Sequence, residues 1–299
     1  MNFERITIKS HYFFSLLIIM ILPVLSMTGC VPSTALPAST LTSLPFLPSP
    51  TDTMTWTPSP LPSITSTPFS QIRNTPMTLM LHPGTQVFDS AAFLKEFIAL
   101  LEANDMKVIT YQDILKDPGI TAREQGKLAI ISIDDIYLQN ILDSSIKMMI
   151  SMLLEAHIPA VLGVVTQGNV PNAETAGLLK RFGEAGWEIA THTDTHPFLG
   201  ELERSSPGSV SLEIRTSQDK IESATGLRPV TLILPYGQSV YDLSLISNEG
   251  IRWVVGIGGG NTYDTTRDVF FVGREGPDGT PPMTFNIMMR RFNSDLVLP

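Results

Sequence analysis

The 299-residue chain has little of two things, cysteine and positive charge. Cys30 is its only cysteine, so neither an internal disulfide framework nor a cysteine-rich zinc module can form. Twenty basic side chains stand against 29 acidic ones, which gives a net charge of −9. A nucleic-acid binder needs a basic face to meet phosphate, so this balance argues against a nucleic-acid partner. The length suits one large domain or two small ones with a buried core.

The first 29 residues have the pattern of a targeting segment. Two basic residues precede Phe13–Leu25, a mostly apolar run that is too short to span a bilayer comfortably. Met27-Thr28-Gly29-Cys30 follows and resembles a bacterial lipobox, with cleavage before the cysteine and acylation of its thiol. We therefore expect residues 1–29 to be a lipoprotein signal peptide, and Cys30 to hold the protein on a membrane outside the cytoplasm. The alternative is an ordinary secretory signal with a chance cysteine.

The next segment is of low complexity. Residues 31–76 contain 10 prolines and 18 serines or threonines, and their only charges are Asp52 and Arg73. Such a sequence cannot offset the entropy of ordering by burying apolar surface. We expect residues 30–76, which include the lipidated cysteine, to be a disordered tether, and residues 77–299 to form the folded domain.

Within residues 77–299, short β-rich runs alternate with amphipathic stretches. The predicted strands are Met77–Leu81, Lys107–Thr110, Leu128–Ile133, Ala160–Val165, Trp187–Thr191, Val230–Leu234, Arg252–Val255, Val269–Val272 and Phe285–Met289. Helices are predicted around Leu94–Leu101 and over 140–157 and 174–185. Strands that alternate with helices favour a parallel sheet, and we expect an α/β barrel of about seven strands. Functional residues in such barrels lie where strands end.

Two predicted strand ends carry polar clusters. Asp134 and Asp135 close the Leu128–Ile133 strand, and His192-Thr-Asp-Thr-His196-Pro197 follows the Trp187–Thr191 strand. Two histidines four residues apart can converge on one metal ion, and an aspartate would complete three protein ligands. Three ligands leave positions open for water and substrate, as in catalytic sites. Each cluster is a weak signal alone, because HxxxH and Asp-Asp also occur without a metal.

Together with a third segment, the clusters resemble a known family. The segment Lys127–Asp135 is similar to the first motif of the polysaccharide deacetylases, which are carbohydrate esterase family 4. Gly186–Pro197 resembles the second motif, Leu234-Pro235-Tyr236-Gly237 the third, and Leu79–His82 the first strand. The resemblance covers essentially all of residues 77–299. It implies a distorted (β/α)7 barrel that removes acetyl groups from amino-sugar polymers or from some O-acetylated polysaccharides.

The resemblance also implies roles for individual residues. Asp134 matches the catalytic base, and the backbone N–H of Tyr236 matches a donor to the oxyanion. The implied ligands of a divalent metal, zinc above all but also cobalt or nickel, are Asp135, His192 and His196. Thr193 matches the position that braces the metal loop, and the implied substrate side of the site comprises Thr193, Pro235 and Gly237.

Several positions depart from the family pattern. Ile136 stands where the family has glycine, and Ile233 where many members have the arginine that orients the base. Arg274 could substitute for that arginine. No histidine follows His196, so the family's late histidine, which protonates the leaving amine, has no match. His82 is the remaining candidate, although a lone histidine is more often structural.

The leading hypothesis is a metal-dependent deacetylase of an acetylated cell-wall or cell-surface polysaccharide, monomeric and held to the membrane by its N-terminal lipid. The departures favour an alternative, a glycan-binding surface lipoprotein that keeps the fold without turnover. A peptidase or another amidase on the same site is a third possibility. The sequence leaves open the polymer and the choice between N- and O-acetyl groups.

Overall fold

The computed structural model describes residues 72–83, 89–139, 141, 143–167, 171–258 and 260–294. The expected signal peptide, Cys30 and the tether up to residue 71 lie outside the described residues. Among the helices that the structure describes, none is long and apolar enough to cross a membrane.

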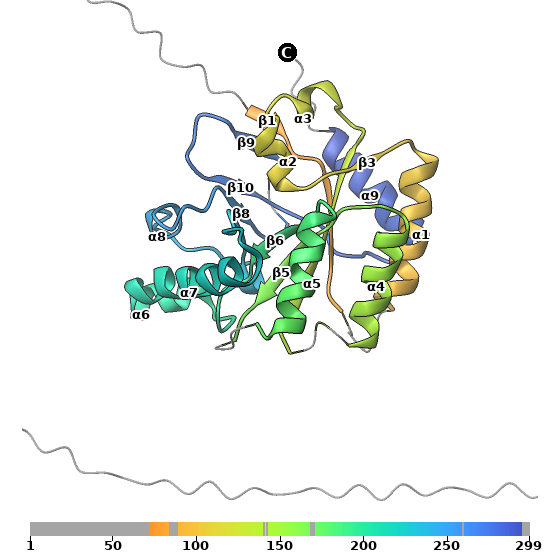
Figure 1. The fold of residues 1–299 in the computed structure, drawn as a ribbon. Helices are drawn as coiled ribbons and strands as arrows, with labels where there is room; N and C mark the ends of the chain where they lie inside the picture. Colours follow the sequence, from red (N-terminus) through yellow and green to blue (C-terminus); the bar gives the residue numbers. More distant parts are fainter. Residues whose placement is uncertain are drawn as a thin grey trace, which may run out of the picture. The chain divides into compact units, whose positions relative to one another are not determined.

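Strands and helices alternate along most of the described chain (Figure 1). The strands are β1 (Ile72–Asn74), β2 (Met77–Leu81), β3 (Lys107–Val108), β4 (Leu128–Tyr137), β5 (Val161–Val165), β6 (Glu188–Thr191), β7 (Thr231–Ile233), β8 (Trp253–Val255), β9 (Thr262–Asp264) and β10 (Phe270–Val272). The helices are α1 (Ser90–Ala103), α2 (Tyr111–Lys116), α3 (Ile120–Arg123), α4 (Ser144–Glu155), α5 (Ala173–Glu184), α6 (Leu199–Ser205), α7 (Pro207–Thr225), α8 (Ser244–Ser247) and α9 (Pro281–Ser294), with a 3₁₀ turn at Pro235–Gly237.

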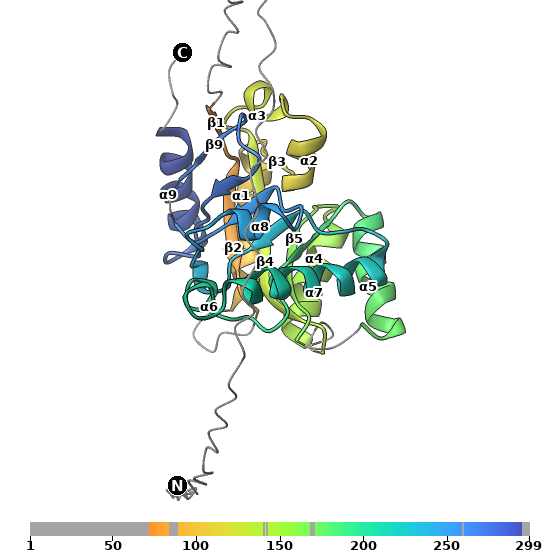
Figure 2. The same cartoon turned by 90° about the vertical axis from the view of Figure 1, so that its left-hand side faces the viewer.

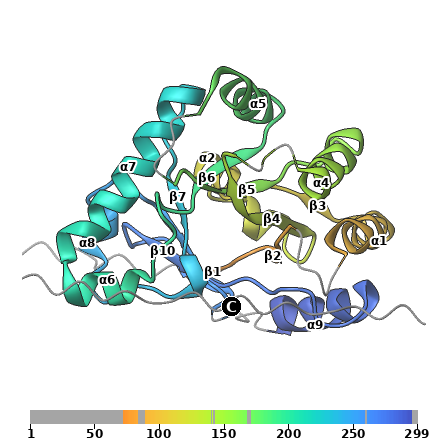
Figure 3. The ribbon, with the colours of Figure 1, turned by 90° about the horizontal axis from the view of Figure 1, so that it is seen from below.

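The main sheet is parallel and follows the order β10-β8-β7-β6-β5-β4-β2, with β3 also pairing with β4. Every residue of β2 and β5 is buried, as expected of strands covered on both faces. The sheet curls, and Figure 3 shows helices α1, α4, α5 and α7 along its outer side. Strands β1 and β9 form a separate antiparallel pair, which lies with α2 and α3 at one end of the domain (Figure 2). The expected α/β barrel is confirmed as a curled parallel sheet with helices along its outer side.

The chain after β10 reaches back to the opposite edge of the sheet. Met80 in β2 donates its N–H to the Glu275 carbonyl oxygen at 2.8 Å, and Glu275 donates to the Thr78 carbonyl oxygen at 3.1 Å. These two bonds form a parallel bridge between Leu79 and Glu275. The bridge closes the curled sheet and places the neighbouring Arg274 inside the barrel, where it is 1% exposed.

Two sequence predictions need correction. Phe285–Met289 is not a strand but part of α9, because the buried residues Phe285, Met288 and Phe292 recur at helical spacing. Helix α7 was not predicted, since polar residues, Ser217 and Gln218, share its buried face with the apolar ones. In addition, Ile72–Asn74, within the segment expected to be a tether, form β1.

Glu188 generates a prediction about stability. Its carboxylate is buried in β6, where Gln112 N–H donates to Oε2 at 2.9 Å and the Thr231 hydroxyl donates to Oε1. Burial raises the pKa of Glu188 from 4.5 to about 7. The folded state therefore retains a proton that the unfolded chain loses. The stability contributed by this proton is complete below pH 4.5 and is lost as the pH rises through about 7.

We expect Glu188→Gln to remove this pH dependence. The free energy of unfolding of the variant minus that of wild type should increase by on the order of 3 kcal/mol as the pH rises from about 4.5 to about 8. Urea unfolding across that range measures the difference, and Glu184→Gln, at an exposed site in α5, is the control. A difference between Glu188→Gln and wild type that stays constant with pH would contradict the prediction.

Candidate metal and catalytic site

A bulge in β4 turns two consecutive carboxylates toward the same region. Ile133 pairs with Leu162 and Ile136 with Val164 in β5, so three steps along β4 match two along β5. Side chains normally alternate between faces, which would separate Asp134 from Asp135. The extra residue and a positive φ of 55° at Asp135 break that alternation. Asp134 becomes buried, with 2% of its side chain exposed, whereas the Asp135 side chain is 35% exposed.

His192 lies directly after β6 and is held by the backbone of β7. Its Nδ1 lies 2.9 Å from the Ile233 carbonyl oxygen. Because a carbonyl can only accept, the imidazole carries its proton on Nδ1 and leaves the lone pair of Nε2 free. The Ile233 backbone thus orients a predicted metal ligand, although its side chain departs from the family's arginine.

The loop after His192 turns back sharply to bring His196 beside it. Thr193 and His196 have φ values of 66° and 60°, in the left-handed region that non-glycine residues rarely adopt. The fully buried Thr193 hydroxyl accepts the His196 N–H at 3.0 Å. This bond links two residues of the loop, and the bracing role of Thr193 stays a prediction.

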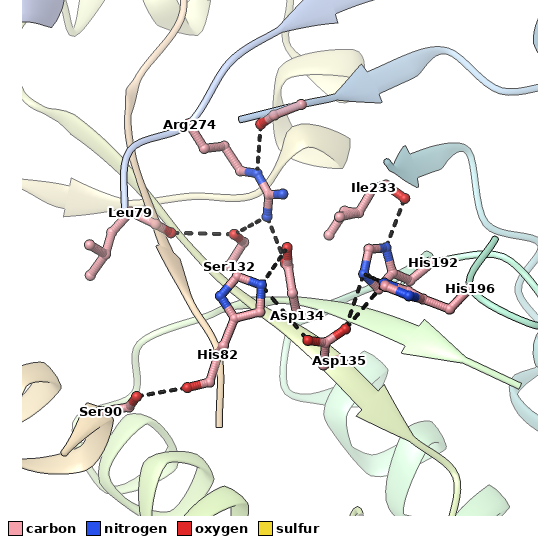
Figure 4. A network of polar contacts seen from close by, with 11 residues as sticks. Leu79, His82, Ser90, Ser132, Asp134, Asp135, His192, His196, Ile233 and Arg274 are labelled. Atoms are coloured by element: carbon pink, nitrogen blue, oxygen red, sulfur yellow. Dashed lines mark hydrogen bonds and ion pairs between the residues drawn. The ribbon is translucent and has the colours of Figure 1, made fainter. Parts of the chain in front are cut away.

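Three donor atoms converge at the ends of β4 and β6 (Figure 4). Asp135 Oδ1 lies 3.4 Å from His192 Nε2 and 3.3 Å from His196 Nε2, and the two Nε2 atoms are 3.0 Å apart. A tetrahedral ion bound at about 2.0–2.1 Å would separate its ligands by about 3.3 Å. Asp135 Oδ1 is buried and makes no hydrogen bond within the described residues. The residues therefore fit a divalent metal.

The protonation states of the two partly exposed donors also suit a metal. Burial, reinforced by the neighbouring His192, lowers the pKa of His196 and favours the neutral imidazole that a metal requires. Burial raises the pKa of Asp135, but the neighbouring imidazoles of His192, His82 and His196 outweigh it, so the net pKa lies below the usual range.

Asp134 has a different set of partners from Asp135. Arg274 Nη1 donates to Asp134 Oδ1 at 2.6 Å and to Ser132 Oγ at 2.7 Å, while Arg274 Nε donates to the Gly256 carbonyl oxygen at 3.2 Å. Burial raises the pKa of Asp134, but the Arg274 charge and hydrogen bond outweigh it, and the net pKa is lowered. Arg274, which the sequence offered as a possible substitute for the missing family arginine, thus contacts Asp134 directly.

His82, directly after β2, faces both carboxylates. Its Nε2 lies 3.8 Å from Asp134 Oδ2 and 3.9 Å from Asp135 Oδ2, and 31% of the side chain is exposed. Ser90 Oγ donates to the His82 carbonyl oxygen at 2.7 Å and ties this position to α1. The lone histidine is therefore part of the cluster rather than a remote structural residue.

The third motif forms the wall beside His196. The Tyr236 ring lies 4.6 Å from that of His196 and stacks on Phe198, with centroids 3.8 Å and planes 11° apart. Tyr236 has a φ of 56°, and a Cβ at Gly237 would meet Ile257 at 2.8 Å. The turn is therefore closely packed. Pro235 is buried and Gly237 partly exposed, so the contact with substrate expected of Thr193, Pro235 and Gly237 stays a prediction.

Most of the predicted site residues lie together, but three contributors were not predicted. The only sequence signal for Ser132 was its place in a predicted buried strand. The only signal for Phe198 was its position directly after His196-Pro197. Glu213 accepts hydrogen bonds from the metal loop and comes from α7, which the sequence did not reveal.

The comparisons with known proteins agree with this geometry. Residues 121–251 match the family model described as polysaccharide deacetylase. This range includes Asp134, Asp135, His192, His196 and Tyr236 but neither His82 nor Arg274. No curated protein matches the chain.

Three solved structures have similar folds. A Streptococcus pyogenes deacetylase, PplD, in complex with acetate has a TM-score of 0.58 at 15% identity, over 72% of this chain and 99% of that one. The de-N-acetylase from Aggregatibacter actinomycetemcomitans has a TM-score of 0.57 at 19% identity, over 71% and 98%. IcaB from Ammonifex degensii has a TM-score of 0.57 at 16% identity, over 72% and 96%.

These likenesses concern the fold, and the family match concerns the sequence around the clustered aspartates and histidines. Both single out the same part of the molecule. Residues 121–251 therefore match the polysaccharide deacetylase family, and the domain that contains them has a fold similar to that of solved deacetylases.

Proposed function

We propose that the protein is a metal-dependent deacetylase that removes acetyl groups from an N-acetylated amino-sugar polysaccharide. The observation that carries the proposal is that two adjacent carboxylates, Asp134 and Asp135, have different partners. Asp135 faces the two imidazoles with an unpaired oxygen, whereas Asp134 is held by Arg274 and is left out of the group of potential metal ligands. A ligand and a separate base are what hydrolysis at a metal requires.

Asp135, His192 and His196 would hold the ion, with zinc the first choice and cobalt or nickel suited to the same donors. When bound, the ion would supply polarisation of the acetyl carbonyl and activation of a water. Asp134, kept ionised by Arg274, would accept the proton of the attacking water. The backbone N–H of Tyr236 would stabilise the oxyanion.

His82 is the group best placed to protonate the leaving amine. It is the histidine next to both carboxylates that is absent from the potential metal-ligand set, and it is open to solvent. The exposed faces of Phe198 and Tyr236, 39% and 51% exposed, would pack against sugar rings beside the ion. The names of two similar structures, a deacetylase and a de-N-acetylase, support this reaction type.

We propose in addition that the protein acts outside the cytoplasm on cell-wall or cell-surface glycan, anchored through a lipid on Cys30. The lipobox-like Met27–Cys30 segment supports this location. The positions that favoured a binding protein without turnover have compensating contacts. Ile136 packs in the core, the Ile233 carbonyl holds His192, and Arg274 occupies the place of the missing arginine.

The central test is acetate release from chitooligosaccharides, poly-N-acetylglucosamine and peptidoglycan, with added zinc or cobalt and after chelation. We expect release that the chelator abolishes. Asp134→Asn should lower kcat by about 10²- to 10⁴-fold with unchanged metal content, because it removes the base but keeps an acceptor for Arg274. Asp135→Ala should lose both metal and activity. Binding of these glycans by the wild type without acetate release would favour the binding protein instead.

A second experiment tests His82 as the acid. His82→Gln should lower kcat on N-acetylated sugar by about 10²-fold or more, because an amine leaves poorly without a proton. The same variant should keep most of its activity on an aryl acetate, whose phenolate needs no proton to leave. An equal loss on both substrates would assign His82 a structural role.

A third experiment tests the buried ion pair by a double-mutant cycle. Arg274→Met should reduce the free energy of unfolding by about 3–5 kcal/mol, because it leaves the Asp134 charge buried without a partner. Adding Asp134→Asn to Arg274→Met should restore part of that loss, since the uncompensated charge is gone. Urea unfolding measures each corner of the cycle, and additive effects would contradict the pairing.

A further inference from the structure

The metal-binding loop is attached to helix α7 by side chains that lie outside the donor cluster. We propose that Glu213 is a positioning residue for the metal centre: it fixes the His192–His196 loop so that both imidazoles face Asp135. The inference rests on the metal site proposed above. It assigns a function in that site to a helix that the sequence did not reveal.

The loop needs an external support because its own backbone is strained. Thr193 and His196 both have positive φ values, and such residues cost on the order of 1–3 kcal/mol each unless their surroundings hold them. The side chains of Asp194, Thr195 and His196 in the loop are only partly buried or exposed. Core packing alone therefore does not determine where the second imidazole lies.

Glu213 supplies three hydrogen bonds at the centre of the loop. Its Oε2 accepts the N–H groups of Asp194 at 3.0 Å and of Thr195 at 2.8 Å. Its Oε1 accepts the Thr195 hydroxyl at 2.7 Å. A carboxylate that accepts two successive backbone N–H groups fixes the direction of the chain between the two histidines, and charge-assisted bonds of this kind are the strong ones.

Two more residues of α7, Ser217 and Lys220, bind the same segment. About two turns along the helix from Glu213, Lys220 Nζ donates to Asp194 Oδ1 at 2.7 Å, and Asp194 also accepts from the Thr166 hydroxyl after β5. Thr191, just before His192, donates its hydroxyl to Ser217 at 2.8 Å. Of these three α7 side chains, Glu213 is the one that accepts hydrogen bonds from the backbone of the loop.

The experiment is a titration of the purified protein with Co²⁺, followed by visible absorption, which reports affinity and coordination together. Glu213→Ala should weaken Co²⁺ binding by about 10- to 100-fold and alter the visible bands. Glu213→Gln keeps an acceptor for the two N–H groups and an amide for Thr195, so its affinity should stay within about threefold of wild type. Rescue by glutamine would identify the bonds to the loop as the cause.

Arg215→Ala is the matched control. Arg215 lies two residues along the same helix and pairs with Glu249, away from the loop, so its removal should leave Co²⁺ affinity and spectrum unchanged. Should Glu213→Ala not fold, Thr195→Val takes its place. That variant deletes one Glu213 contact at an exposed residue and should weaken binding on the order of 2- to 10-fold.

The outcomes separate two failures. If the wild type binds no Co²⁺, the proposed metal site is wrong. It is also wrong if His192→Ala binds Co²⁺ as tightly as the wild type does. If the wild type binds Co²⁺ and His192→Ala does not, the metal site stands. Then an unchanged affinity in Glu213→Ala, or in Thr195→Val where alanine does not fold, would overturn the role of Glu213. A loss of the same size in Arg215→Ala would overturn it as well.

Discussion

The buried ion pair between Arg274 and Asp134 connects the segment that closes the barrel with a carboxylate of the candidate site. Both side chains are almost fully buried, so each charge would be costly alone. Arg274 comes from the segment that pairs with β2 and closes the sheet, while Asp134 comes from the bulge of β4. The same guanidinium also holds Ser132, whose hydroxyl reaches the Leu79 carbonyl oxygen of β2. The charge state of Asp134, the proposed base, therefore depends on closure of the barrel.

The site is assembled on backbone that few side chains tolerate. Asp135, Thr193, His196 and Tyr236 all have positive φ values, and none is a glycine. Two of them are expected metal ligands, one braces the loop, and one offers the predicted oxyanion donor. The surrounding structure must hold each in place, as the Glu213 and Thr193 hydrogen bonds do around His196. These strained conformations place the donor atoms of Asp135, His192 and His196 within 3.4 Å of one another.

The sequence predicted those parts of the fold and site that depend on local pattern. Runs such as Leu128–Ile131 are apolar throughout and form strands covered on both faces, and the two polar clusters follow those strands as expected. The strand prediction for Phe285–Met289 was wrong because four of its five residues are apolar, and so short an apolar run is typical of a strand as well as of a helix. The burial of Arg274 against Asp134 depends on pairing between distant segments, and the support from Glu213 on a helix whose buried face is partly polar. Neither leaves a periodic signal in the sequence.

The closing segment has a consequence for the order in which the molecule matures. Arg274 and Asp134 are 140 residues apart in the chain. During synthesis from the N-terminus, Asp135, His192 and His196 are all made before Arg274. A chain interrupted between β8 and β10 would contain Asp135, His192 and His196 but not Arg274, so Asp134 would lack its buried partner. The arrangement proposed for hydrolysis would therefore be complete only after the last strand of the sheet has been made.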